Sequence, residues 1–273
     1  MGLLKNIIRP LVPQSIQRKI LEARVEARIK REIQNWRDLD LHRELAGLNV
    51  KVSSLSDWSV FNEIFVERLY DRAIADALSQ APTDRMLHVF DLGANVGFFA
   101  LRFSQMVFQS DNPHRPFFIH CVEGSPRVYA ELTARVSANP RLKGHIEVRH
   151  GLVGKKSGST EMYESLFGAG NSTIPQSEHW SKPVTVPYID LDTLISSNEP
   201  IALLKCDIEG SEQTFQDHYH NMLLRTQSAI VELHHSYINL EKFHAGMTAL
   251  GFTKRKVLWE SEKLQASLIL YRH

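Results

Sequence analysis

The segment VFDLGANVGFFALRFSQ, residues 89–105, carries the strongest structural signal in the chain. Its apolar start predicts a strand that ends at Asp91, and an apolar helix is predicted to begin near Val96. Gly93 allows a tight turn between the two, and Gly97 lets the chain pass close to a ligand without a clash from a Cβ atom. In open α/β sheets ligands bind at the carboxyl ends of the strands, which is where this turn would lie.

Apolar runs of the same kind continue to the end of the chain. Seven of them span residues 86–93, 116–124, 145–154, 201–210, 228–235, 252–258 and 265–272. The first five alternate with helical or loop segments, the pattern of a parallel sheet that is covered on both faces. The last two are joined by WESEKL, which predicts a hairpin and so an antiparallel strand. The expected fold class is α/β: a Rossmann-like, seven-stranded, mostly parallel sheet with an antiparallel last strand.

Two domains are expected: an N-terminal helical extension over residues 1–59 and a sheet domain over 60–273, which would open with a helix at 60–80. The stretch 155–183 is rich in Gly, Ser and Lys and is predicted to be a loop or a small excursion beside the sheet.

The extension is basic, with eight Lys or Arg against two Glu in its first 31 residues. Its apolar spacing predicts an amphipathic helix over 14–36. This helix would pack on the core or on a second subunit of a homodimer, and a weaker hypothesis is peripheral contact with an anionic membrane surface.

Composition excludes several classes of protein. The net charge of +1 gives no electrostatic case for nucleic-acid binding. Only two cysteines occur, which argues against a disulfide framework. We find neither a membrane-spanning apolar stretch nor a secretory signal, so a cytoplasmic location is expected.

The residues of the glycine turn indicate which ligand it suits. A dinucleotide loop has the pattern G-x-G-x-x-G, whereas this turn lacks the glycine triplet and places Asp91 at the strand tip. A carboxylate there repels phosphate and suits a ligand with an ammonium group, such as S-adenosylmethionine. The next strand ends in Glu123, which could accept hydrogen bonds from both ribose hydroxyls. We therefore expect Asp91, Gly93, Ala94, Asn95, Gly97 and Glu123 to bind S-adenosylmethionine.

A second motif, LLKCDIEGSE at 203–212, is predicted to open into the same crevice. Lys205, Asp207 and Glu209 alternate, so they would share a face if the strand continued that far. The functional interpretation of these crowded charges competes with a structural one. In the latter, Lys205 and Asp207 form an ion pair and Glu212 only decorates a helix start.

The pairing of DLGANVG with LLKCDIEGSE, followed by VELHH at 231–235, resembles the FkbM family of methyltransferases over roughly residues 85–272. The resemblance implies S-adenosylmethionine as methyl donor and, commonly, a hydroxyl of a sugar, glycolipid or polyketide-type metabolite as acceptor. Asp91, Gly93, Asn95, Gly97 and Glu123 match the cofactor residues of that family. His150 and Leu152 stand where the family often has Asn and Ala.

Methyl transfer to a hydroxyl needs a group that takes the proton or a metal that stabilises the oxygen. The proposed catalytic residues are Asp207, Glu209 and His234, with a neutral His234 imidazole as one candidate base and His235 as a further candidate. Alternatively, Asp207, Glu232 and His234 could hold a divalent ion, although no metal site is predicted.

The segment with Asn171, Ser172 and Thr173 could bind acceptor hydroxyls. Two alternatives to the methyltransferase are an NAD-dependent oxidoreductase and a non-catalytic cofactor-binding protein.

Overall fold

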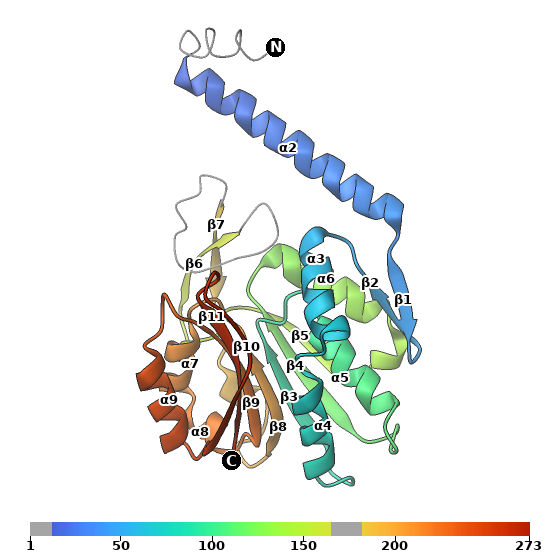
Figure 1. Cartoon of the computed structure of the whole chain (residues 1–273), viewed down its shortest axis with the longest axis vertical. Helices are drawn as coiled ribbons and strands as arrows, with labels where there is room; N and C mark the ends of the chain where they lie inside the picture. Colours follow the sequence, from blue (N-terminus) through green and yellow to red (C-terminus); the bar gives the residue numbers. More distant parts are fainter. Residues whose placement is uncertain (1–12, 165–181) are drawn as a thin grey trace.

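A single seven-stranded sheet organises the computed structural model, which describes residues 13–164 and 182–273 (Figure 1). The strand order is β10-β11-β9-β8-β3-β4-β5. In chain order the strands are β3 (Leu87–Leu92), β4 (Phe117–Glu123), β5 (Ile146–His150), β8 (Ile201–Cys206), β9 (Ser228–His234), β10 (Lys254–Ser261) and β11 (Ala266–Arg272). All seven predicted runs therefore form strands.

Strand directions match the prediction. The pairs β3–β4, β3–β8, β4–β5 and β8–β9 are parallel. The last strand, β11, is antiparallel to both of its neighbours, β9 and β10. The fold is a Rossmann-like α/β sheet with one antiparallel strand.

Both faces of the sheet are covered, which explains why its strands are apolar without interruption. Alternate residues of β3 point to opposite faces, so Val89 joins one core cluster and Phe90 the other. Helices α4 (Asp71–Gln80), α5 (Phe98–Phe108) and α6 (Pro126–Ser137) supply residues to the first cluster. Helices α7 (Glu212–His218), α8 (His220–Leu224) and α9 (Leu240–Ala249) supply the second. Short helical turns η3 (Pro140–Leu142) and η4 (Leu191–Thr193) complete the two layers.

The N-terminal part contains the predicted helix and an unpredicted hairpin. Helix α2 (Gln14–Leu39) ends three residues beyond the predicted boundary and stands away from the sheet (Figure 1). The hairpin of β1 (His42–Leu45) and β2 (Leu48–Lys51) follows, and Leu48 and Val50 are fully buried in the first core cluster. The division at residue 59 stays a prediction. Among the described residues no helix combines the length and apolarity that crossing a membrane requires.

The single helix predicted over 60–80 is wrong. The chain instead forms α3 (Leu55–Phe61), a π-helical turn η2 (Asn62–Val66) and α4. Between η2 and α4, Arg68 adopts a left-handed conformation with φ of 58°. That conformation ends a right-handed helix, yet neither Gly nor Pro marks the position in the sequence.

The excursion beside the sheet is partly regular. Strands β6 (Ser159–Glu164) and β7 (Lys182–Pro187) pair antiparallel in a separate two-stranded sheet. Residues Asn171, Ser172 and Thr173, the predicted acceptor contacts, lie outside the described residues.

The buried His120 of β4 makes stability depend on pH. Its ring stacks on Phe90 at a centroid distance of 4.5 Å, and neither ring nitrogen has a hydrogen-bond partner among the described residues. Burial, with help from His88 and Arg149, lowers the pKa of His120 from 6.5 to about 4. The imidazole is therefore neutral in the folded protein, whereas the unfolded chain protonates it below about pH 6.5.

We expect the free energy of unfolding contributed by this histidine to fall as the pH decreases from about 7.5 to about 5.5, by about 1 kcal/mol. Urea unfolding at both pH values should show a smaller loss in His120→Leu than in the unsubstituted protein. The exposed His114 provides the control, because His114→Gln should leave the loss unchanged. Equal losses in the unsubstituted protein and His120→Leu would contradict this account.

Candidate cofactor and active site

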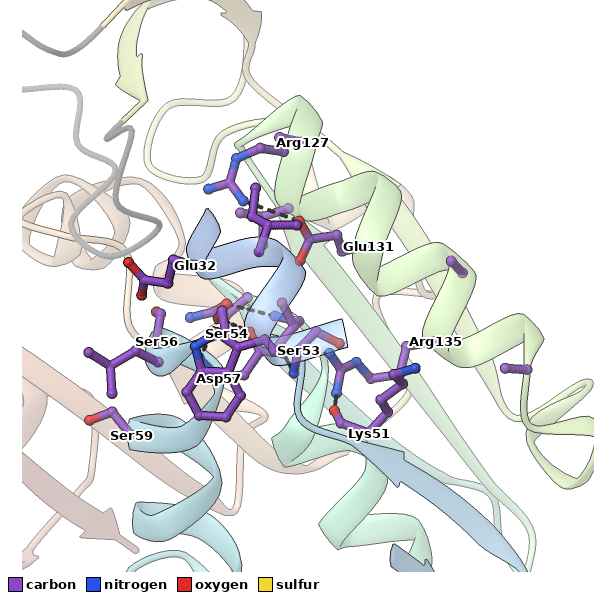
Figure 2. Close-up of a pocket in the computed structure, with 18 of the residues that line it drawn as sticks. Glu32, Lys51, Ser53, Ser54, Ser56, Asp57, Ser59, Arg127, Glu131 and Arg135 are labelled. Atoms are coloured by element: carbon purple, nitrogen blue, oxygen red, sulfur yellow. Dashed lines mark hydrogen bonds and ion pairs between the residues drawn. The ribbon is translucent and has the colours of Figure 1, made fainter. Parts of the chain in front are cut away.

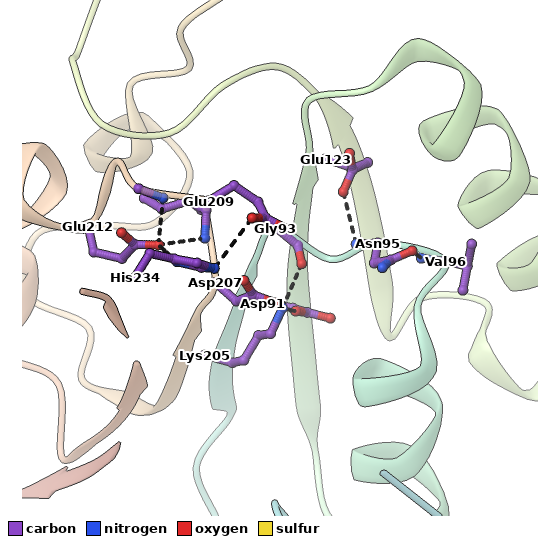
Figure 3. Close-up of polar contacts among 12 residues, drawn as sticks. Asp91, Gly93, Asn95, Val96, Glu123, Lys205, Asp207, Glu209, Glu212 and His234 are labelled. Atoms are coloured by element: carbon purple, nitrogen blue, oxygen red, sulfur yellow. Dashed lines mark hydrogen bonds and ion pairs between the residues drawn. The ribbon is translucent and has the colours of Figure 1, made fainter. Parts of the chain in front are cut away.

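The strand order changes direction beside β3. From β3 the chain builds outward to β4 and β5 on one side, and later to β8 and β9 on the other. The carboxyl ends of β3 and β8 therefore flank a crevice at the topological switch point, where ligands bind in open α/β sheets. Asp91, Glu123 and Asp207 all lie at this edge, as Figure 3 shows. The predicted cofactor residues and the second motif are thus brought together.

Gly93 sits where two backbones nearly touch. Its φ of 69° forms the predicted tight turn, and its amide and that of Ala94 both donate to the carbonyl of Val122 at 3.0 Å. A Cβ atom built on Gly93 would lie 1.7 Å from the carbonyl oxygen of Asp207. Gly93 is therefore needed for packing of the two motifs against each other.

Gly97 lies close to a neighbouring helix. It adopts φ of 88° at the start of α5, and a Cβ atom there would lie 2.5 Å from the side chain of Leu132 in α6. The left-handed backbone and the close approach of α6 both require this glycine, and its contact with a ligand stays a prediction. The neighbouring Asn95 has φ of 48° and accepts a hydrogen bond from the Val96 amide at 2.8 Å.

Glu123 holds the loop in place. Its carboxylate accepts hydrogen bonds from the amides of Asn95 at 2.9 Å and Ser125 at 2.8 Å (Figure 3). The side chain is 8% exposed, and burial raises the pKa of Glu123 in spite of these two amides. Each carboxylate oxygen has a second lone pair, so ribose hydroxyls could still bind. Its role toward a ribose stays a prediction.

Asp91 does not face the crevice alone. The side chain is fully buried, and the Nζ atom of Lys205 lies 3.5 Å from Asp91 and 3.4 Å from Asp207. Lys205 also donates a 2.6 Å hydrogen bond to the carbonyl of Gly93. Burial raises the pKa of Asp91, and Lys205 opposes that shift. The ion pair between Lys205 and Asp207 that the structural interpretation predicts is thus present. Asp91 shares the same ammonium group.

Glu212 is more deeply involved in the site than its place at a helix start predicts. Its side chain is fully buried at the first residue of α7. One carboxylate oxygen accepts hydrogen bonds from the amides of Ile208 and Gly210, each at 3.2 Å, and lies 3.1 Å from Nδ1 of His234. The interpretation of Glu212 as helix decoration is therefore wrong. A glutamate directly after Gly-Ser at a helix start was the available signal.

His234 lies between two glutamates, with its Nε2 atom 3.3 Å from Glu209 (Figure 3). Burial by itself lowers the pKa of His234, but the hydrogen bond and charge of Glu212, together with Glu209, raise it above the ordinary value. The expected neutral imidazole is thus corrected to an imidazolium at neutral pH. Burial and the charge of Asp207 raise the pKa of Glu209, which makes this carboxylate the better proton acceptor of the two.

Strand β8 ends at Cys206, so Glu209 does not continue the alternation of Lys205 and Asp207. It reaches His234 because its backbone turns with φ of 52°. The described residues also contain one set with metal-ligand spacing: Asp207, Glu232 and His234 offer ligand atoms within 4.8 Å of one another.

A separate cavity of about 870 Å³ lies between α2, α3 and α6 (Figure 2). Asn95 and Val96 form part of its wall, whereas Asp91, Glu123 and Asp207 do not. In its wall Arg135 pairs with the buried Asp57 at 2.9 Å. The cavity therefore adjoins the glycine loop and includes Asn95 alone of the predicted cofactor residues.

No protein family model and no curated protein sequence matches the chain. A similar solved structure is methyltransferase FkbM from Methylobacillus flagellatus, with 13% identity and a TM-score of 0.49 over 71% of this chain and 45% of that one. Precorrin-6y C5,15-methyltransferase from Geobacter metallireducens has 9% identity and a TM-score of 0.42, over 76% and 89% of the two chains. The N-terminal domain of human METTL16 in complex with SAH has 10% identity and a TM-score of 0.42, over 78% and 69%. The chain spans less than half of the FkbM structure, and identities this low concern the fold alone.

The contact at Gly93 can be tested against a glycine with open space. Gly144 has φ of 82° and no atom within 4 Å of a built Cβ. We expect Gly144→Ala to lower the free energy of unfolding by about 1 kcal/mol, from backbone strain alone. Gly93→Ala should cost at least about 2 kcal/mol more, because the Asp207 backbone must move. Urea unfolding of both variants checks this, and similar losses would show that the two motifs do not pack as described.

Proposed function

We propose that this protein is a methyltransferase of the FkbM type that uses S-adenosylmethionine. The observation that carries the proposal is the loop from Gly93 to Gly97, which is held by Glu123 at the switch point of the sheet. Its sequence lacks the glycine triplet of a dinucleotide site. The adjoining strand ends contribute Asp91 and Asp207 against the single cation of Lys205, a net negative charge.

This charge balance favours a cationic ligand over a pyrophosphate. Glu123 would accept hydrogen bonds from the ribose hydroxyls, and the backbone of residues 93–95 would bind the methionine part. The carboxylates of Asp91 and Asp207 contribute a favourable field for a sulfonium. S-adenosylmethionine supplies an electrophilic methyl group when bound.

The proposed acceptor is a hydroxyl of a sugar, glycolipid or polyketide-type metabolite. As the new C–O bond forms and the C–S bond breaks, the acceptor oxygen loses its proton. Glu209 is the proposed proton acceptor for two reasons. Its carboxylate lies at the same edge of the sheet, and burial and the charges of neighbouring acids raise its pKa. His234, fixed by Glu212, orients Glu209 through the 3.3 Å contact. Positioning of the two substrates accounts for much of the remaining rate enhancement.

Isothermal titration with S-adenosylmethionine and with NAD separates the proposal from its alternatives. We expect binding of S-adenosylmethionine only, and at least about tenfold weaker binding in Glu123→Gln, which keeps one carbonyl acceptor for the loop. The exposed Glu241 gives a matched control, since Glu241→Gln should bind like the unsubstituted protein. Preferential binding of NAD would indicate an oxidoreductase, and binding of neither would refute the proposal.

Turnover provides a second test, with labelled S-adenosylmethionine and extracts of the source cells as acceptor. Glu209→Gln or His234→Ala should lower the rate of methyl transfer by about 100-fold or more, the usual contribution of general acid–base catalysis. Binding of S-adenosylmethionine should stay near that of the unsubstituted protein. Unchanged turnover in both variants would remove these residues from the mechanism. The labelled product would also identify the acceptor.

A further inference from the structure

Three ligand-forming side chains meet beside the proposed methyl-transfer site. Asp207, Glu232 and His234 each offer one atom, and the three atoms lie within 4.8 Å of one another. Each side chain is only partly buried, so small ions can reach the set. Two carboxylates and one imidazole suit a hard divalent cation such as Mg²⁺ or Mn²⁺ better than zinc.

The sheet fixes this juxtaposition. Glu232 and His234 are two residues apart on β9 and so point to the same face. Strand β8 runs parallel to β9 with Cys206 opposite Val231, which places Asp207, the next residue, beside Glu232. The set therefore comes from rigid strand ends, and its spacing does not depend on loop residues outside the described parts of the chain.

The histidine ring is oriented as in many metal sites. Glu212, fully buried, holds Nδ1 of His234 at 3.1 Å. The other ring nitrogen, Nε2, lies 3.3 Å from Glu209, and a cation bound there would take the place of the proton on Nε2 and of this contact. Metal-binding histidines usually donate their second N–H to a carboxylate, which fixes the ring and increases its basicity as a ligand.

The buried side chain of Tyr70 supplies a second observation at this site. Tyr70 is 4% exposed, and its hydroxyl makes no hydrogen bond with any residue that the structure describes. The charged groups that act on this phenol are Lys205, Asp207, Glu232 and Glu63. The hydroxyl is thus free to donate a hydrogen bond to a bound ion's water or to an acceptor oxygen beside these carboxylates.

The balance of charge indicates that the missing group is a cation. Glu232 makes no hydrogen bond within the described part of the chain, and its near neighbours Asp207 and Glu209 are also acidic. Lys205 is already shared between two aspartates, and His234 between two glutamates. The carboxylate of Glu232 is therefore left without a cation of its own.

We propose that Asp207, Glu232 and His234 bind one divalent cation, Mn²⁺ or Mg²⁺. This role rests on the proposed function: the cation would hold the acceptor oxygen beside the methyl donor and favour the deprotonated form of that oxygen. Tyr70 would donate a hydrogen bond to a water or acceptor oxygen on the cation. The acceptor is accordingly an oxygen compound that can bind a hard metal ion.

Electron paramagnetic resonance of the full chain with Mn²⁺ tests this without S-adenosylmethionine. We expect one Mn²⁺ bound per chain, displaced by excess Mg²⁺, with the magnetic coupling of a single imidazole nitrogen. Glu232→Gln should weaken Mn²⁺ binding at least about tenfold, whereas the exposed Glu241→Gln should not. Thermal unfolding of each variant confirms that it is folded. Should Glu232→Gln fail to fold, the nitrogen coupling in the unsubstituted protein decides the question.

Three outcomes overturn the inference: no binding of Mn²⁺, binding without a nitrogen coupling, or equal binding in Glu232→Gln. Titration with S-adenosylmethionine is run on the same samples. A protein that binds the nucleoside but not Mn²⁺ contradicts the metal site alone. A protein that binds Mn²⁺ but not the nucleoside contradicts the proposed function and leaves the cation site standing.

Discussion

The buried ammonium group of Lys205 is the interaction on which the site depends. It joins β8 to β3 through ion pairs with Asp207 and Asp91 and a hydrogen bond to the carbonyl of Gly93. Burial alone would lower the pKa of Lys205, but the two aspartates raise it, so the group stays charged. Without this cation, the carboxylates of Asp91 and Asp207 would repel each other at the switch point between β3 and β8.

The ion pairs of Lys205 also determine how charge is distributed in the crevice. Lys205 pairs with Asp91 and Asp207, whereas Glu209 and Glu212 lie on either side of the His234 imidazole. A folded protein accepts such an excess of acids at a cost in stability, and such costs concentrate at functional sites. The negative field is thus a consequence of how the two strands are joined, and it favours cationic ligands on the β9 side of the crevice.

The sequence allowed the sheet to be predicted because each strand is a short, continuous apolar run, and such runs are formed by buried parallel strands. Asp91, Glu123 and Asp207 could be placed together for the same reason, since parallel strands end at one edge. Glu212 escaped prediction because its partner, His234, is remote in sequence. The charge state of His234 could not be foreseen either, because it depends on which carboxylates face the ring.

The break between α3 and α4 shows how an unpredicted feature can serve the site. A continuous helix over 60–80 would have carried Glu63 and Tyr70 along one straight axis. The π-helical turn and the left-handed Arg68 redirect the chain, and Tyr70 is buried where the charges of Lys205 and Asp207 act on its hydroxyl. Burial raises the pKa of Glu63, and the charge of Asp207 adds to this rise. Because π-helical turns and left-handed residues cost energy and often occur at functional sites, their position here supports a role for this segment in ligand binding.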